Sequence, residues 1–221
     1  KRLVPIYSVD TTEKKVALTF DAAWGSDKTS KIVDILKENE VGGTFFLVGF
    51  WIEANKDKVK MIDEAGLDIG THSSTHPKMS TLSSEKMTEE LSKSSQQITE
   101  ITGKKVEFFR PPFGDYNDAL INVATSLGLK TIQWDVDTLD WKGLLASEIL
   151  ARVKSSVKNG SIILCHNNSD HIVEALPLII EYLKSEGYKM VKISELVYSS
   201  NYIIDNNGLQ IDGKVEEVKA L

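Results

Sequence analysis

The sequence predicts one α/β domain, folded as a distorted (β/α)7-type barrel. Short β-rich runs alternate with helical patterns along most of the 221 residues, which indicates a parallel sheet joined by right-handed crossovers. The predicted strands are short, and no glycine-rich nucleotide turn follows the first of them, which favours a barrel over an open nucleotide-binding sheet. The length and a hydrophobic content of 41% suit a single domain with a sizeable core.

Seven short runs, most of them rich in β-branched and aromatic residues, are the predicted strands. In chain order they cover residues 16–20, 43–48, 67–71, 106–109, 130–134, 162–164 and 188–191. The first run, from Val16 to Phe20, is almost entirely apolar and is therefore expected to be buried.

Helical periodicity fills the intervals between these strands. The predicted helices cover residues 28–40, 58–64, 85–102, 118–127, 146–157 and 171–185, and a last short helix begins at 194. The first of them, for example, places Ile32, Ile35 and Leu36 on one face. Ser26 or Asp27 is its expected cap, and Gly103 is expected to end the long helix of 85–102.

Three segments are expected along the chain. The barrel domain spans residues 16–200, after an N-terminal extension of 1–15 and before a C-terminal appendage of 201–221. The boundary at 201 follows from the loss of alternation there, since 206–208 and 212–213 are turn-like. The appendage is expected to lie outside the barrel.

Charge and composition exclude several classes of partner. A net charge of −6 gives no electrostatic footprint for nucleic acid and argues against broad docking on an anionic membrane. No run approaches the ~20 apolar residues of a membrane helix, so no membrane insertion is expected within these residues. The chain begins at Lys1 without a signal-like segment, so any export signal or anchor is expected upstream. The single cysteine, Cys165, is expected to be a buried small hydrophobe.

Ionisable residues follow five of the predicted strands closely. They are Asp21 after the first strand, His72 after the third, Arg110 after the fourth, Asp135 and Asp137 after the fifth, and His166 after the sixth. Active sites of parallel α/β folds form at the C-terminal ends of the strands. We therefore expect these side chains to share one rim of the barrel and to form a hydrolytic centre.

The pair His72 and His76 is a candidate metal site. If residues 72–76 form a helical turn, the two imidazoles lie on one face, close enough to share a divalent metal. The alternative is a pair of solvated loop histidines. Three of the chain's four histidines lie at strand ends, and Asp21 is expected nearby across the barrel mouth, which favours the metal site.

Two loops offer partners for this centre. Residues 110–114 are predicted to form a rigid turn, because two prolines fix φ. The Arg110 guanidinium is either an ordinary surface group or the bidentate partner of a carboxylate. Asp137, Asp140 and Trp141 are either a turn cluster or a functional set. In the second case an acid orients Arg110 or tunes His166, and Trp141 forms an apolar wall for a sugar or an acetyl group.

Five motifs at strand ends are specific when taken together and in order. They are Thr19-Phe20-Asp21, His72-Ser73-Ser74-Thr75-His76-Pro77, Arg110-Pro111-Pro112-Phe113-Gly114, Asp137-Thr138-Leu139-Asp140-Trp141 and Leu164-Cys165-His166. From about residue 16 to 197 the chain resembles the polysaccharide deacetylases, the NodB-homology domain of carbohydrate esterase family 4. The resemblance implies a distorted barrel and a metal-dependent hydrolase of linear amide C–N bonds, which removes acetyl groups from N-acetylated sugars.

The resemblance also implies a role for each matched residue. Asp21 would be the general base and His166 the general acid, while Arg110 would position Asp21 and Asp137 would tune the acid–base pairs. His72 and His76 would hold a divalent metal, which is expected to be zinc. The implied substrate pocket consists of Trp24, Pro111, Phe113, Trp141 and Leu164. A glycan partner, peptidoglycan or an N-acetylglucosamine polymer, and an extracytoplasmic location follow from the same resemblance.

The first motif departs from the family pattern. Members write Thr-Phe-Asp-Asp-Gly, where the second Asp is the third metal ligand, but this chain has Ala22 at that position and continues Ala23-Trp24-Gly25. The variant resembles a sporulation-associated subgroup, which points to spore or cell-wall peptidoglycan. Asp21 or Asp27 could replace the missing ligand. Two interpretations follow: a working deacetylase with a weak or unusual metal site, or a carbohydrate-binding or structural relative that lost its metal chemistry.

Overall fold

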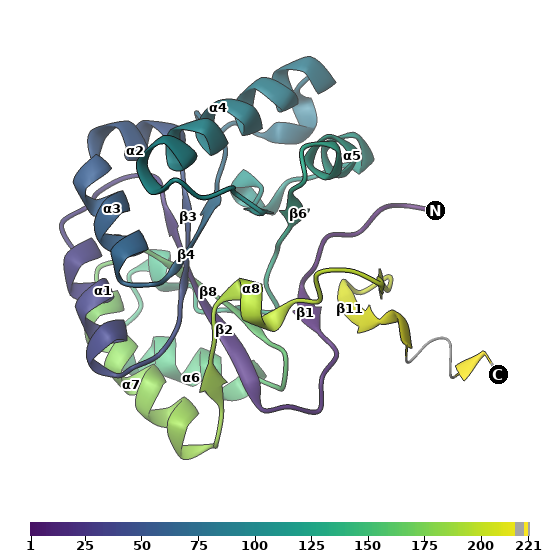
Figure 1. Ribbon diagram of the computed structural model, residues 1–221. Helices are drawn as coiled ribbons and strands as arrows, with labels where there is room; N and C mark the ends of the chain where they lie inside the picture. Colours follow the sequence, from purple (N-terminus) through teal and green to yellow (C-terminus); the bar gives the residue numbers. More distant parts are fainter. Residues whose placement is uncertain (215–218, 221) are drawn as a thin grey trace.

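A curved parallel sheet forms the centre of the molecule (Figure 1). The computed structural model describes residues 1–214 and 219–220. Its main sheet has eight strands: seven lie in the order β6-β5-β4-β3-β2-β8-β7, and β9 pairs with the start of β2. The strands are β2 (Lys15–Ala22), β3 (Thr44–Leu47), β4 (Asp68–Thr71), β5 (Phe108–Phe109), β6 (Lys130–Thr131), β7 (Val136–Asp137), β8 (Ile162–His166) and β9 (Lys189–Met190). All neighbours in it are parallel, which confirms the predicted α/β barrel-like fold.

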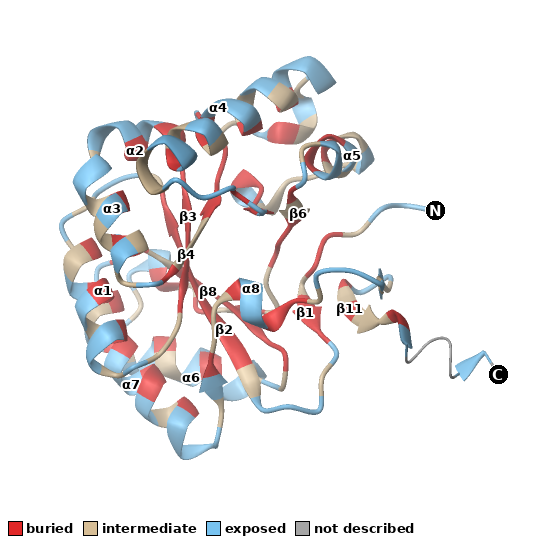
Figure 2. Ribbon diagram, viewed as in Figure 1, coloured by how far each residue is buried: buried red, intermediate tan, exposed pale blue. Residues whose placement is uncertain are grey.

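Helices surround this sheet and cover its outer face, with their exposed sides turned to solvent (Figures 1 and 2). They are α1 (Thr29–Glu38), α2 (Gly49–Ala54), α3 (Lys56–Glu64), α4 (Ser84–Thr102), α5 (Asp118–Ser126), α6 (Ala146–Ser156), α7 (Ile172–Ser185) and α8 (Ile193–Leu196). Three short 3-10 turns are η1 (Met79–Thr81), η2 (Pro112–Gly114) and η3 (Asp140–Lys142). No described helix has the length and apolar character needed to cross a membrane.

Three local predictions differ from the structure. The strand expected at 130–134 ends at Thr131 as β6, and the chain then crosses to the opposite edge of the sheet and forms β7, which was not predicted. Helix α2 was also missed, because six residues are too few to show a helical period. Neither Ser26 nor Asp27 caps α1, whose N-cap is Lys28 without a side-chain hydrogen bond. Gly103 does end α4, with a left-handed φ of 71°.

The two ends of the chain pack together beside the gap between the edges of the main sheet (Figure 1). Strand β1 (Ser8–Val9) joins β10 (Tyr202–Ile204) and β11 (Leu209–Asp212) in a separate three-stranded sheet. The Ile6 backbone donates to Thr131 O over 2.9 Å and accepts from Gln133 N over 2.7 Å. Val9 N bonds Gly160 O, where φ is 81° and a side chain would overlap the Val9 carbonyl. The N-terminal segment thus hydrogen-bonds to β6 at one edge of the open sheet and to Gly160, just before β8, near the other edge.

Strand β2 separates an apolar face from a polar one. Val16, Leu18 and Phe20 belong to the large cluster between the sheet and the helices. Side chains alternate along a strand, so Thr19 and Asp21 face the other way, into the barrel, where both meet Arg110. Ala22 continues the apolar set and is fully buried in the same cluster as Phe20. Ala22, at the position where the resemblance implies a third metal ligand, is therefore part of the apolar core.

Candidate active site

The candidate residues meet at the C-terminal ends of neighbouring strands. Asp21 on β2 lies in register with His166 on β8, His72 directly follows β4 and Arg110 directly follows β5. The single rim predicted from the sequence therefore brings these four residues together. Asp135 is an exception, because its carboxylate accepts from Ser161 Oγ over 2.9 Å and from Ile162 N over 2.7 Å, at the start of β8. It lies before β7 and not at the end of a strand, so its predicted place on the rim is wrong.

A fully buried guanidinium holds the candidate base. Arg110 Nη1 donates to Asp21 Oδ1 over 3.0 Å and to Thr19 Oγ1 over 2.8 Å, and Nη2 donates to the Gln133 carbonyl over 2.9 Å. The guanidinium also lies over the Phe46 ring, 4.4 Å from its centroid. The predicted bidentate pair is wrong, since only one nitrogen reaches the carboxylate. Burial raises the pKa of Asp21, but the charge of Arg110, with a smaller effect of His166, outweighs it and holds that pKa below its usual value.

His72 is fixed in one orientation. Its Nδ1 lies 2.7 Å from the Arg110 carbonyl oxygen, which can only accept, so Nδ1 carries the proton and Nε2 presents a lone pair. That Nε2 lies 3.6 Å from Asp21 Oδ2. Burial lowers the pKa of His72 despite the opposing effect of Asp21. The ring is therefore neutral, and its Nε2, which can donate a lone pair to a metal ion, faces the candidate base.

His76 meets His72 through an irregular loop and not through the helical turn that was predicted. Ser73 and His76 have φ values of 73° and 61°, which no helix contains. The two rings still make an edge contact, with centroids 5.0 Å apart. Burial lowers the pKa of His76 to about 4, so it is neutral as well. Its Nδ1 is buried and has no hydrogen-bond partner among the residues that the structure describes.

Glu90 on α4 holds this loop, and sequence patterns gave no sign of it. Its Oε2 accepts from the backbone N–H groups of Ser74 (2.8 Å) and Thr75 (2.9 Å), and its Oε1 accepts from the Thr75 hydroxyl (2.6 Å). The Ser74 hydroxyl donates to the Glu90 carbonyl over 2.6 Å. These bonds tie the segment between the two histidines to a long helix.

The residues present do not fit a complete three-ligand metal site. His72 and His76 are neutral, close together and partly lacking other partners, so they suit two ligand positions. The third position lacks a donor, because Ala22 is an apolar core residue and Asp21 is engaged by Arg110. Asp27 is exposed and lies 3.7 Å from Lys28. Within residues 1–214 and 219–220, no three His, Cys, Asp or Glu side chains are grouped so as to hold a metal.

His166 is held by Asp140, which is fully buried. Asp140 Oδ1 lies 2.8 Å from His166 Nδ1, and Oδ2 accepts the His166 backbone N–H over 2.7 Å. Burial lowers the pKa of His166, but the hydrogen bond to Asp140 and the charges of Asp21, Asp140 and Asp137 outweigh it, so the pKa is raised. Asp137 acts only through its charge, since its carboxylate accepts from Leu139 N.

The predicted pocket residues divide into buried and exposed groups. Leu164 and Pro111 are buried, whereas Trp24, Phe113 and Trp141 are 61%, 71% and 59% exposed. Trp24 and Phe113 both place their rings edge-on to His76, with centroids 5.0 and 4.7 Å away. Exposed aromatic faces beside a polar site are suited to sugar rings, whose faces are apolar and whose edges carry hydroxyls.

Residues 8–132 match the family model described as polysaccharide deacetylase, and the chain belongs to this family. It is 36% identical over 193 residues to the uncharacterized protein YlxY of Bacillus subtilis, covering 87% of this chain and 60% of that relative. It is 32% identical to the peptidoglycan-N-acetylmuramic acid deacetylase PdaA of B. subtilis, covering 87% and 74%. The chain thus spans less than two thirds of the length of YlxY.

Among solved structures, BA3943 of Bacillus anthracis is similar over most of the chain. It is described as a CE4 family pseudoenzyme, and it superposes with a TM-score of 0.85 at 40% identity over 87% of this chain and 68% of that one. A mutant of BA3943 with restored enzymatic activity gives a TM-score of 0.84 at 41% identity, over 87% and 71%. PdaA superposes with a TM-score of 0.82 at 31% identity, over 87% and 84%.

Proposed function

We propose that this site hydrolyses the acetamide of an N-acetylated sugar in a glycan chain. One observation carries the proposal: a base and an acid lie in register on neighbouring strands, and each is held by its own buried partner. Arg110 keeps Asp21 ionised, and Asp140 keeps His166 protonated to a higher pH than an ordinary histidine. The two groups thus have the protonation states that amide hydrolysis needs.

The chemistry follows from these states. Asp21 takes a proton from a water that attacks the acetyl carbon, and His166 gives a proton to the sugar nitrogen as the C–N bond breaks, which leaves acetate and a free amine. Arg110 stays in place as the buried counter-charge of Asp21. The histidine pair lies beside the base and supplies two neutral nitrogen donors at the point of attack.

Peptidoglycan is the proposed substrate and the cell wall the proposed location. This rests on the similarity to PdaA, which is described as a peptidoglycan deacetylase. Exposed aromatic rings around the site support a sugar polymer as the ligand. Spore peptidoglycan is the narrower possibility raised by the first motif.

Acetate release from N-acetylglucosamine oligomers and from purified peptidoglycan tests the proposal, with and without added zinc. His166→Ala should lower turnover far more than binding, because its proton is needed only as the bond breaks. Equal losses in both would remove His166 from the acid role. Absence of acetate release from every substrate, at any zinc concentration, would refute the proposal.

A second candidate is glycan binding without turnover. It is favoured by Ala22, which leaves two ligands where catalytic zinc sites use three, and by the similarity to a described pseudoenzyme. In that case the wild-type chain binds oligomers without releasing acetate, and Ala22→Asp releases acetate when zinc is added. Calorimetric titration with zinc tests the ligand assignment under either candidate: His72→Ala should abolish any zinc binding, and retention of zinc would refute the assignment.

A further inference from the structure

Phe50 is a large aromatic residue that the candidate site does not use. It lies on the first turn of α2 and is 39% exposed. Its ring centroid is 5.8 Å from that of Trp24, and Trp24 in turn contacts His76. A series of ring contacts therefore runs from His76 through Trp24 to Phe50 at the start of α2.

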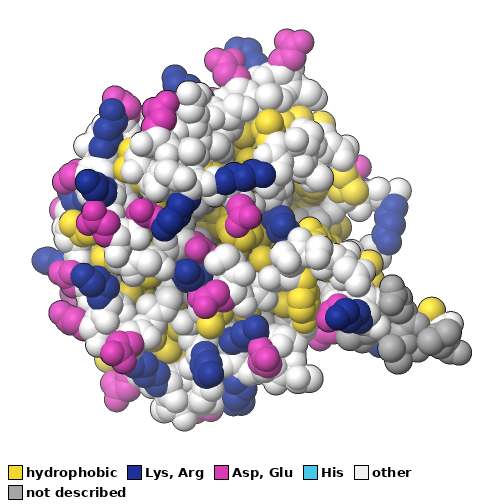
Figure 3. Space-filling model, viewed as in Figure 1, with side chains coloured by type: hydrophobic (Ala, Val, Ile, Leu, Met, Phe, Trp, Pro, Cys, Tyr) yellow, Lys and Arg dark blue, Asp and Glu magenta, His cyan; other side chains and the backbone are white. Residues whose placement is uncertain are grey.

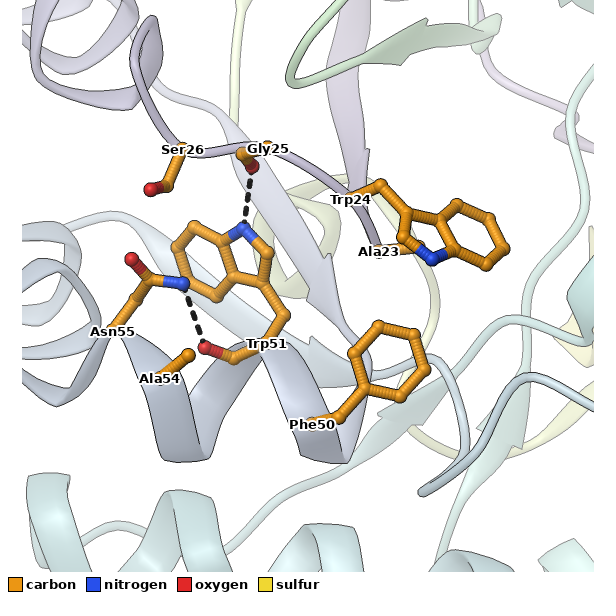
Figure 4. Close-up of a pocket in the computed structure, with 8 residues that line it drawn as sticks. All are labelled: Ala23, Trp24, Gly25, Ser26, Phe50, Trp51, Ala54 and Asn55. Atoms are coloured by element: carbon orange, nitrogen blue, oxygen red, sulfur yellow. Dashed lines mark hydrogen bonds between the residues drawn. The ribbon is translucent and has the colours of Figure 1, made fainter.

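A hollow of about 350 Å³ lies between α2 and the loop that follows β2 (Figure 4). Its base is rigid, because the buried Trp51 indole N–H donates to the Gly25 carbonyl over 2.7 Å. Trp24 and Phe50 extend to the same side of the hollow, and Ser26 and Asn55 lie at the other (Figure 4). The Asn55 amide nitrogen is bound to the Trp51 carbonyl, so its oxygen remains as an acceptor.

Two more hollows continue from the first. One of about 540 Å³ shares Phe50 and Ala54 with it and reaches Lys93 and Gln97 on α4. The next, of about 240 Å³, shares Ser74, Thr75 and Lys93 with the second. Because they share lining residues, the three hollows lie next to one another along the surface, and together we call them the α2–α4 groove.

The groove borders the candidate active site, since Trp24 lines it and contacts His76. Its inner wall includes Thr75, which lies between the two histidines, and Trp24, which follows Asp21 by three residues. Its charged lining residues are of both signs: Lys86 and Lys93, with Glu53, Glu89 and Glu90. Charges of both signs are also mixed on the face of the molecule that Figure 3 shows. A groove with mixed charges and a small negative excess suits an uncharged polymer better than a polyanion such as nucleic acid.

We propose that the α2–α4 groove binds a neutral glycan chain, with Phe50 stacking on a sugar ring beyond the one that carries the reacting acetamide. The inference rests on the proposed function in that it takes the same polymer as ligand. Phe50 supplies the apolar face, and Ser26, Asn55 and Lys93 supply polar groups for ring hydroxyls. The groove makes affinity depend on chain length, whereas the acetamide site responds to a single sugar.

Calorimetric binding of N-acetylglucosamine dimer and hexamer, and of cellohexaose, tests this. Phe50→Ala should weaken hexamer binding about fivefold to thirtyfold, the loss expected of one aromatic anchor, and leave dimer binding unchanged. Phe50→Tyr should retain affinity, whereas Phe50→Leu should lose most of it. Leu178→Ala is the matched control, since Leu178 on α7 is also 39% exposed. Cellohexaose, which lacks acetamides, should show the same dependence on Phe50.

The outcomes separate the groove from the chemistry. Acetate release with hexamer affinity that is unaffected by Phe50→Ala would overturn the groove and leave the proposed function intact. Hexamer and cellohexaose binding that depends on Phe50, without acetate release, would support the groove and refute the hydrolase. A Phe50→Ala variant that weakens dimer and hexamer equally would also overturn the inference, and Phe50→Tyr controls for misfolding.

Discussion

Asp140→Asn is the most informative single substitution in this site. Asp140 is fully buried and accepts both from the His166 backbone N–H (2.7 Å) and from His166 Nδ1 (2.8 Å). Asparagine has the same shape but no charge. If its oxygen keeps the backbone bond, its NH2 group faces Nδ1, and His166 must then turn Nδ1 into an acceptor. The substitution therefore removes the feature that favours a protonated imidazole.

The size of the effect follows from the bond that is lost. A hydrogen bond between charged partners contributes about 1.5–3 kcal/mol, so the turnover of an active enzyme should fall about tenfold to a hundredfold. The pKa of His166 should fall, because the hydrogen bond and charge of Asp140 are leading causes of its elevation. Stability should change with pH as well. A raised pKa contributes stability that is complete below about pH 6.5 and is lost as pH rises through the folded-state pKa. This dependence should shrink in Asp140→Asn.

Histidine ring signals followed by NMR through a pH titration measure the pKa directly, even in an inactive protein. The His166→Ala spectrum assigns the signal. Asp137→Asn is the matched control: it removes a charge from the same loop without touching the His166 ring, since Asp137 accepts from Leu139 N. An unchanged His166 pKa in Asp140→Asn, or an equal fall in Asp137→Asn, would refute the assignment of Asp140 as the partner.

Three further predictions concern stability and reactivity. Arg110→Met should lower the free energy of unfolding by about 3–5 kcal/mol in urea titrations, because it leaves the buried Asp21 carboxylate without its counter-charge; a loss below 1 kcal/mol would contradict the ion pair. Glu90→Gln should cost about 1–2 kcal/mol and speed amide exchange in residues 73–76, while exchange in α7 stays unchanged; unaltered exchange would show that the loop holds its own shape. Burial raises the pKa of the Cys165 thiol, so it should react with a maleimide only at the rate of unfolding, and rapid labelling of the native protein would show that the strand opens locally.

Strand order explains why the rim of the site could be predicted. Parallel strands end at one edge of the sheet, so residues at the C-terminal ends of predicted strands must lie near each other wherever the strands pair. Asp21, His72, Arg110 and His166 satisfy this condition, and the structure brings them together. The prediction for Asp135 was wrong because the predicted fifth strand was too long. The chain crosses the barrel after Thr131, and Asp135 lies before β7.

Contacts between distant elements could not be predicted in this way. Glu90 is in the middle of a long amphipathic helix, where a glutamate normally faces solvent, and nothing in its neighbourhood marks it as the residue that binds the Ser74–Thr75 backbone. The helical turn predicted for residues 72–76 would have brought the two imidazoles together through local backbone geometry alone. The structure reaches the same contact through positive φ at Ser73 and His76, held in place by that distant carboxylate.

Asp140, and not Asp137, binds His166 for a local reason that only the backbone conformation reveals. Asp137 bonds Leu139 N, and Leu139 adopts a left-handed φ of 50°, which reverses the chain before η3. The reversal places Asp140 beneath the end of β8, where it is fully buried and meets both the backbone and the ring of His166. Either acid satisfied the sequence argument, because both lie in the loop after a strand. Asp137 shapes the turn, and the turn determines that Asp140 is the acid that holds His166.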